Sequence, residues 1–155
     1  MFRHLLVPTD GSPLSQEAVT RAISFASEAG ARITFFCAVQ PLPKMYFAEG
    51  AIFDAHTCTA YREKMVEAAN EILDAAQKRA EAAGVACGKA ALLSTEPYEA
   101  IIEAATENEC DLIFMASHGR RGISGFLLGS ETQKVLTHST IPVLVHRSTD
   151  QVAGA

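Results

Sequence analysis

Residues 111–132 read DLIFMASHGRRGISGFLLGSET. The first six are apolar apart from Asp111 and have the length of a buried strand, whereas residues 117–129 are rich in glycine. A short helix is predicted over 130–137, directly after the last of these glycines. A strand that leads through a loop into a helix is the repeating unit of parallel α/β sheets, so this stretch predicts an α/β fold.

The rest of the chain shows the same alternation. Apolar runs of strand length occupy residues 2–7, 33–39, 85–93 and 141–146. Helical spacing of apolar residues predicts helices over 18–29 and 60–83, and a third that starts within 94–97 and is capped by Ser94 or Thr95. Residues 44–57 show no clean period and are expected to form a loop with some local helix.

We therefore expect five strands and four helices in a single doubly wound α/β domain, a five-stranded parallel sheet with helices on both faces. The length of 155 residues, 48% of them hydrophobic and 20% charged, fits one globular domain. We place the domain at residues 1–147 and a flexible, polar C-terminal tail at residues 148–155.

Composition and charge narrow the class of partner. Thirteen Lys and Arg against eighteen Asp and Glu leave a net charge of −5, so the surface repels a phosphate backbone and no nucleic acid partner is expected. No apolar run approaches the roughly 20 residues that cross a bilayer, and the N-terminus does not resemble a signal peptide, so no membrane partner is expected. The four cysteines are scattered and are expected to be reduced thiols in the cytoplasm.

Ligands of open parallel sheets bind beyond the carboxyl ends of strands, where the strand order reverses. Two predicted strand ends carry unusual chemistry, residues 8–12 and residues 117–132. The second holds four glycines within residues 119–129 and then opens a helix, whose outward-pointing N–H groups suit a phosphate. Arg120 and Arg121 can supply the opposite charge. The alternative is an ordinary surface loop before a capped helix.

Other chemistries fit the sequence less well. Residues 84–90 resemble a P-loop only in part, because the glycines are too close together and Ala90 stands where a hydroxyl is needed. Residues 122–125 are one residue short of the G-x-S-x-G motif of hydrolases. Asp10 as a nucleophile or metal ligand would need a second carboxylate at a neighbouring strand end, and none is evident.

Four motifs occur in the order and spacing of a known family. They are residues 7–12 (Val-Pro-Thr-Asp-Gly-Ser), the helix over 18–29, Gly119 followed after nine residues by Gly129-Ser130, and residues 139–145 (Ser-Thr-Ile-Pro-Val-Leu-Val). Over residues 2–147 the chain resembles the ATP-binding members of the universal stress protein family. The resemblance implies an adenine nucleotide alpha hydrolase-like, Rossmann-like fold.

The resemblance also implies an adenine nucleotide across the ends of the first and fourth strands. This would be ATP or a related AMP or ADP, with Mg²⁺ bound, where present, through the phosphates. Asp10 would hydrogen-bond the adenine, and Val39 would contact it through apolar atoms. The other implied contacts are Pro8 and Thr9 at the same edge, Met115, Ala116, His118 and Gly119 along the ribose and first phosphates, and Gly129, Ser130, Glu131 and Thr132 at the phosphates.

Three of these residues carry open questions. Ala116 stands where the family's loop has its first glycine, and its methyl group costs about 1 kcal/mol if the backbone there needs a positive φ. Glu131 puts a carboxylate in the first helical turn, where it repels a phosphate unless it points away. His118 either contacts the phosphate or ribose or is a loop histidine facing water.

The expected function is that of a dimeric stress-response or signalling module. The resemblance implies a homodimer through the last strand, Ile141–Val145, and an apolar edge strand is usually paired. No general base is evident near the phosphates, so no catalytic residue and little or no hydrolysis are expected. Two alternatives stay open: a nucleotide-free, dimerising partner protein, favoured by Ala116 and Glu131, and a slow ATPase or autophosphorylating enzyme using Ser117, Ser124 or Ser130.

Overall fold

The computed structural model describes residues 1–41, 55–119 and 128–148. As the sequence predicts, five strands form one parallel sheet, in the order β3-β2-β1-β4-β5. The strands are β1 (His4–Pro8), β2 (Arg32–Val39), β3 (Cys87–Leu93), β4 (Leu112–Ala116) and β5 (Val143–His146). The helices are α1 (Pro13–Ala29), α3 (Ala55–Ala82), α4 (Pro97–Glu107) and α5 (Ser130–His138).

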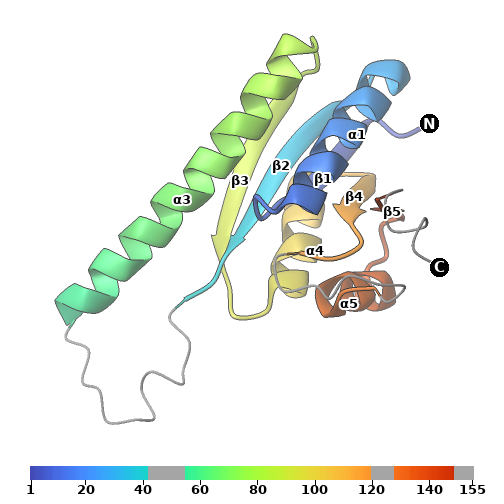
Figure 1. Ribbon diagram of the computed structural model, residues 1–155. Helices are drawn as coiled ribbons and strands as arrows, with labels where there is room; N and C mark the ends of the chain where they lie inside the picture. Colours follow the sequence, from blue (N-terminus) through green and yellow to red (C-terminus); the bar gives the residue numbers. More distant parts are fainter. Residues whose placement is uncertain (42–54, 120–127, 149–155) are drawn as a thin grey trace.

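Helices cover both faces of the sheet, which confirms the doubly wound fold (Figure 1). α1 and α3 pack on one face around Leu5, Val7 and Leu73, and α4 and α5 pack on the other around Leu6 and Phe36. Successive residues of a strand point to opposite faces, so a strand buried on both faces needs an unbroken apolar run. The run Leu5, Leu6 and Val7 meets that need, and all three are fully buried.

α1 starts at Pro13, before residue 18, where the apolar spacing in the sequence predicts the helix to begin. Ser12 is the N-cap, and its hydroxyl accepts a hydrogen bond from the Ser15 amide at 3.3 Å. Proline suits the first helical position because its missing N–H would have no partner there. Gly30 ends the helix with a φ of 65°, in the left-handed region that favours glycine.

The sequence prediction for residues 44–57 is wrong at its end, because α3 already begins at Ala55 rather than at 60. Residues 42–54 lie outside the described part of the chain. The first core residue of α3 is Ala69, and the N-terminal half of the helix extends beyond the sheet (Figure 1). Turns that bury no apolar side chain show no hydrophobic period, so the pattern could not reveal them. Among the described helices, none is long and apolar enough to span a membrane.

The predicted cap of α4 is also wrong. The N-cap residue is Glu96, whose side chain makes no capping bond. Ser94 instead closes a local turn, because its hydroxyl accepts from the Glu96 amide at 3.1 Å. The Tyr98 amide, in the first turn of α4, donates to a carboxylate oxygen of Glu131 on α5 at 2.9 Å. A residue distant in the sequence therefore caps this helix.

The order of the strands places a reversal between β1 and β4. The chain leaves β1 for β2 and β3 on one side and returns for β4 and β5 on the other. β1 and β4 are direct neighbours, with Leu5 opposite Leu112 and Leu6 opposite Ile113. Because the two strands are parallel, the residues that follow Pro8 and Ala116 emerge at the same edge of the sheet, where folds of this kind bind ligands.

Candidate functional site

The turn after β1 is held by its own side chains. One carboxylate oxygen of Asp10 accepts from the Ser12 amide at 2.9 Å, and the Thr9 and Ser15 hydroxyls lie 3.1 Å apart. Gly11 between them has a φ of 76°, which a side chain would strain. The result is a rigid turn that fixes the position of the Asp10 carboxylate at the sheet edge.

Gly119 lies directly against that carboxylate. A Cβ atom at Gly119 would come within 2.5 Å of Asp10 Oδ2. The segment after β4 therefore lies directly against the turn after β1, and a side chain at position 119 would have to displace the Asp10 carboxylate. The fold thus brings together two residues that are 109 positions apart in the sequence.

Gly129 makes the same kind of approach to the end of β4. Its amide donates to the Ser117 carbonyl at 2.8 Å, and a Cβ atom would lie 3.0 Å from both Cα and Cβ of His118. Gly129 is the residue before α5 and has no side chain with which to cap the first amides of that helix. The N–H groups at a helix start have no partner within the helix and attract anions. The start of α5 is thereby positioned beside His118.

Ala116 and Thr132 face inward. Ala116 ends β4 in extended conformation without a positive φ, and its methyl group belongs to the core under α1. Its carbonyl accepts from the Thr132 hydroxyl at 3.1 Å, and Thr132 is only 2% exposed. The methyl group of Ala116 therefore costs no backbone strain, and Thr132 presents its backbone, not its hydroxyl proton, at the helix start.

The Glu131 carboxylate is directed towards α4. One oxygen accepts from the Tyr98 amide at 2.9 Å, and the other lies 3.3 Å from Lys134 Nζ. Lys134 also lies 3.4 Å from Glu96, and the neighbouring Glu131 carboxylate raises the pKa of its ammonium group. The first turn of α5 thus carries a fixed, paired carboxylate.

Some of the predicted contacts do not present side chains at this edge. Val39 is buried in the core beneath α1 and α3, and Met115 is buried on the opposite face, beneath α4 and α5. Pro8 is half-buried and ends β1, while Ser130 is exposed as the first residue of α5. Val39 and Met115 can therefore offer mainly their backbone to a ligand at this edge.

His118 is half-buried, and its Nδ1 lies 3.3 Å from the Ser117 hydroxyl. Ser117 itself is 3% exposed, and its amide donates to the His146 carbonyl at 2.8 Å. Arg120 and Arg121, which the sequence suggested as phosphate partners, lie outside the described residues. The same holds for Ser124.

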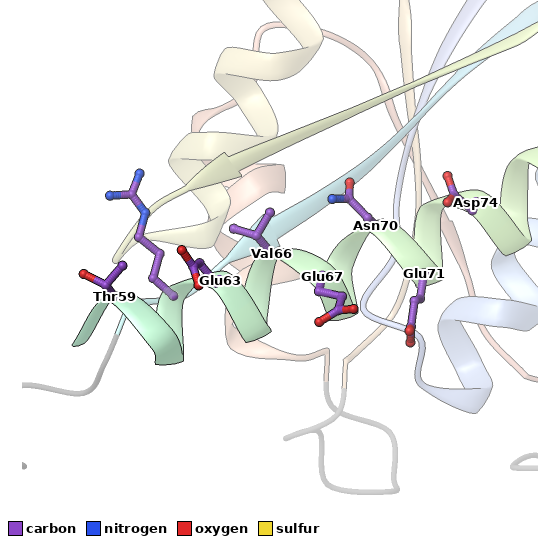
Figure 2. Close-up of a pocket in the computed structure, with 8 residues that line it drawn as sticks. Thr59, Glu63, Val66, Glu67, Asn70, Glu71 and Asp74 are labelled. Carbon is purple, nitrogen blue, oxygen red and sulfur yellow. The ribbon is translucent and has the colours of Figure 1, made fainter. Parts of the chain in front are cut away.

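Two cavities border α3. One, of about 650 Å³, follows an open face of that helix alone, and its lining is mostly charged (Figure 2). Its lining residues are Thr59, Arg62, Glu63, Val66, Glu67, Asn70, Glu71 and Asp74. The other, of about 300 Å³, lies between α1 and α3 and reaches the candidate edge at Thr9 and Gly11. The sequence interpretation missed its remaining lining, although Ile72, Ala76 and Arg79 stand at helical spacing that predicts a shared face.

Buried titratable groups lie at the opposite end of the sheet. Burial and the nearby Arg32 lower the pKa of His4, whose Nε2 lies 2.8 Å from the Thr34 hydroxyl. Burial raises the pKa of the Cys110 thiol to about 12. All four cysteines are free thiols. Within the described ranges, no group of three or more His, Cys, Asp or Glu side chains is placed to hold a metal ion.

These features define a class of protein, a Rossmann-like α/β domain with a candidate site at the reversal of strand order. The family model described as universal stress protein family matches residues 1–147. The chain belongs to the universal stress protein family. It is 35% identical over 151 residues to a universal stress protein of Thermus aquaticus, covering 95% of this chain and 100% of that protein. It is 32% identical over 146 residues to one from Methanocaldococcus jannaschii, covering 94% and 82%.

Solved structures share the fold. The universal stress protein UspA from Lactobacillus plantarum matches with a TM-score of 0.76 at 23% identity, covering 94% of this chain and 98% of that one. A universal stress protein in complex with cAMP matches with a TM-score of 0.68 at 29% identity, covering 96% and 99%. A family protein from Arabidopsis thaliana with AMP bound matches with a TM-score of 0.68, but at 13% identity it shows the fold alone (96% and 94% covered).

Proposed function

We propose that this protein binds an adenine nucleotide across the ends of β1 and β4 and acts as a dimeric stress-response or signalling module. The observation that carries the proposal is the convergence of Asp10, Gly119 and Gly129 at the reversal of strand order. Two glycines there allow backbone to approach where a Cβ atom would meet other atoms at 2.5 Å and 3.0 Å. A relative at 29% identity was solved with cAMP, which supports the same class of ligand.

The nucleotide is oriented by its two ends. Asp10 accepts a hydrogen bond from the adenine, beside Pro8, Thr9 and the end of β2 at Val39. The ribose and first phosphate lie along Met115, Ala116, His118 and Gly119. The remaining phosphates meet the amides of Gly129, Ser130, Glu131 and Thr132 and the exposed hydroxyl of Ser130. A helix start of this kind binds anions through its N–H groups and its dipole.

ATP, ADP and AMP are all candidate ligands, and Mg²⁺ would be bound through the phosphates. The described residues offer no ligand group that would hold the ion by itself. We place the protein in the cytoplasm, in keeping with its free thiols.

The homodimer is proposed to form through Ile141–Val145. β5 is an edge strand, and its four residues are half-buried in the single chain. An apolar edge of this kind is a template for pairing. Replacing Val145 with Asp is expected to yield a monomer in analytical ultracentrifugation without loss of the fold by circular dichroism. A dimer that survives this change would place the interface elsewhere.

Hydrolysis is proposed to be slow or absent. Of the serines considered as phosphate acceptors, Ser117 is buried and unavailable, whereas Ser130 is exposed beside the phosphates. Between these two described serines, transfer of the γ-phosphoryl group of ATP to Ser130, which leaves ADP, is therefore the enzymatic alternative that geometry favours. Incubation with radiolabelled ATP separates the autophosphorylating enzyme from the binding module. Label on the parent protein but not on Ser130→Ala supports the enzyme, and a parent protein without label supports the module.

The first test is direct. The purified protein is denatured and the released small molecules are separated by ion exchange. The refolded, nucleotide-free protein is then titrated with AMP, ADP and ATP by calorimetry. A bound adenine nucleotide or a micromolar affinity supports the proposal. The absence of both would favour the nucleotide-free, dimerising partner protein.

A further inference from the structure

The side chain of Glu131, in the first turn of α5, bonds to groups outside the candidate site. Its carboxylate accepts the Tyr98 amide of α4 at 2.9 Å and lies 3.3 Å from Lys134 Nζ. It therefore joins the starts of two helices that pack side by side at one edge of the sheet. Two partners therefore hold this carboxylate in place.

The surroundings of this carboxylate are acidic. Glu96 and Glu99 lie at the start of α4, and Glu99 accepts from the Tyr98 hydroxyl at 2.9 Å. Lys134 is the cation that pairs with both Glu96 and Glu131. Among these described residues, Lys134 pairs with two of the three carboxylates, and Glu99 bonds to the Tyr98 hydroxyl instead. The field at the start of α5 is therefore less favourable to anions than its helix dipole alone would make it.

We propose that Glu131 sets the preference for the number of phosphates, so that this protein binds a nucleoside monophosphate in preference to the triphosphate. This inference rests on the adenine nucleotide site proposed above. The first phosphate gains the amides at the start of α5, whereas each further phosphate adds negative charge at a helix start whose first turn carries this carboxylate. For an assumed separation on the order of 6 Å, one fixed negative charge at low salt weakens binding by roughly two- to threefold for each negative charge added to the ligand. AMP and ATP differ by about two such charges, which amounts to roughly fivefold.

The test compares affinities for AMP, ADP and ATP, measured by calorimetry at low salt in EDTA. Glu131→Gln keeps an oxygen that can accept from the Tyr98 amide while removing the charge. We expect the ratio of the ATP to the AMP dissociation constant to fall roughly fivefold in this variant, with ADP in between. At 0.5 M salt the repulsion between these charges is screened by roughly two-thirds or more, so the difference in this ratio between the parent protein and the variant should shrink.

Lys134→Met supplies the opposite perturbation. It keeps an apolar stem over the Tyr98 ring, from which Lys134 Nζ lies 5.1 Å, but leaves the Glu131 charge uncompensated. The ratio should therefore rise. Glu103→Gln is the matched control, because Glu103 is exposed on α4 more than a turn beyond Tyr98. It removes the same charge elsewhere and should leave the ratio within about twofold of the parent protein.

The possible outcomes are distinct. Opposite changes of the ratio in Glu131→Gln and Lys134→Met support the inference. An equal change for all three nucleotides, or a shift in the same direction in both variants, would reduce Glu131 to a helix cap and overturn it. Binding of all three nucleotides with an unchanged ratio overturns this inference but not the proposed function. Failure of every nucleotide to bind the parent protein overturns both.

Discussion

Replacing Gly129 with Ala tests where the phosphates lie. The new Cβ atom would come within 3.0 Å of His118 Cα and Cβ and 3.3 Å of the Ser117 carbonyl oxygen. Carbon atoms in contact keep about 3.5 Å between them, so either the start of α5 or its neighbours must give by a few tenths of an ångström. Ser117 cannot yield easily, because backbone hydrogen bonds tie it to both Gly129 and β5.

The cost divides into two parts. Overpacking of this kind lowers the free energy of unfolding by about 1–2 kcal/mol. Displacing the α5 amides from the phosphate is expected to weaken nucleotide binding by at least about tenfold, or ~1.4 kcal/mol at 25 °C. Gly129→Val, with a branched side chain, should weaken binding further.

Urea unfolding followed by circular dichroism measures the first part, and calorimetric titration of the folded variant with AMP measures the second. Gly88→Ala is the control, because a Cβ atom at Gly88 on the edge strand β3 meets nothing within 4 Å. An AMP affinity in Gly129→Ala equal to that of the control would refute the placement of the phosphates at α5.

Three further changes probe the fold. In Gly30→Ala the added Cβ atom meets nothing within 4 Å, but the residue keeps a φ of 65°, which strains an alanine. We expect urea titration to show a loss of about 1 kcal/mol in the free energy of unfolding, and no such loss for Gly88→Ala. Equal values for the two variants would exclude backbone strain as the cause. The pKa of His4 is lowered from 6.5, chiefly by burial, so the unfolded chain binds more protons below that pH. Stability should fall as the pH drops below about 6.5, and His4→Gln should flatten that slope; an unchanged slope contradicts the assignment. Leu73 is only 1% exposed, so Leu73→Ala should lower the free energy of unfolding by about 2–4 kcal/mol. Val66→Ala, on the open face of α3, should lower it by less than about 0.5 kcal/mol. Similar losses in the two variants would mean that α3 packs differently.

Much of the fold could be predicted because its signals are local. The run Leu5–Val7 has to be a strand buried on both faces, and Gly30 ends a helix whose apolar face repeats at helical spacing. The starts of helices were harder to predict. α3 begins with turns that bury nothing, so its start leaves no hydrophobic period in the nearby sequence. Pro97 does mark the start of α4, within the predicted range, but its cap comes from Glu131 on another helix and no local residue could reveal it.

The candidate site likewise has features that the local sequence reveals and features that depend on the fold. The sequence by itself determined which residues are candidates for the site: Asp10 after an apolar strand, and Gly119 and Gly129 around a loop that opens a helix. These are properties of residue type and spacing, which a chain carries before it folds. Their meeting was implied by a family resemblance and depends on β1 and β4 becoming neighbours in the sheet.

Only the tertiary structure decided what Ala116 and Glu131 do. The Ala116 methyl group is harmless because the strand turns it into the core beneath α1. The Glu131 carboxylate is bound to an amide 33 positions away, a partner set by the packing of α4 against α5. The direction of a side chain and its long-range partner follow from the arrangement of whole elements, and no local pattern of residues contains them.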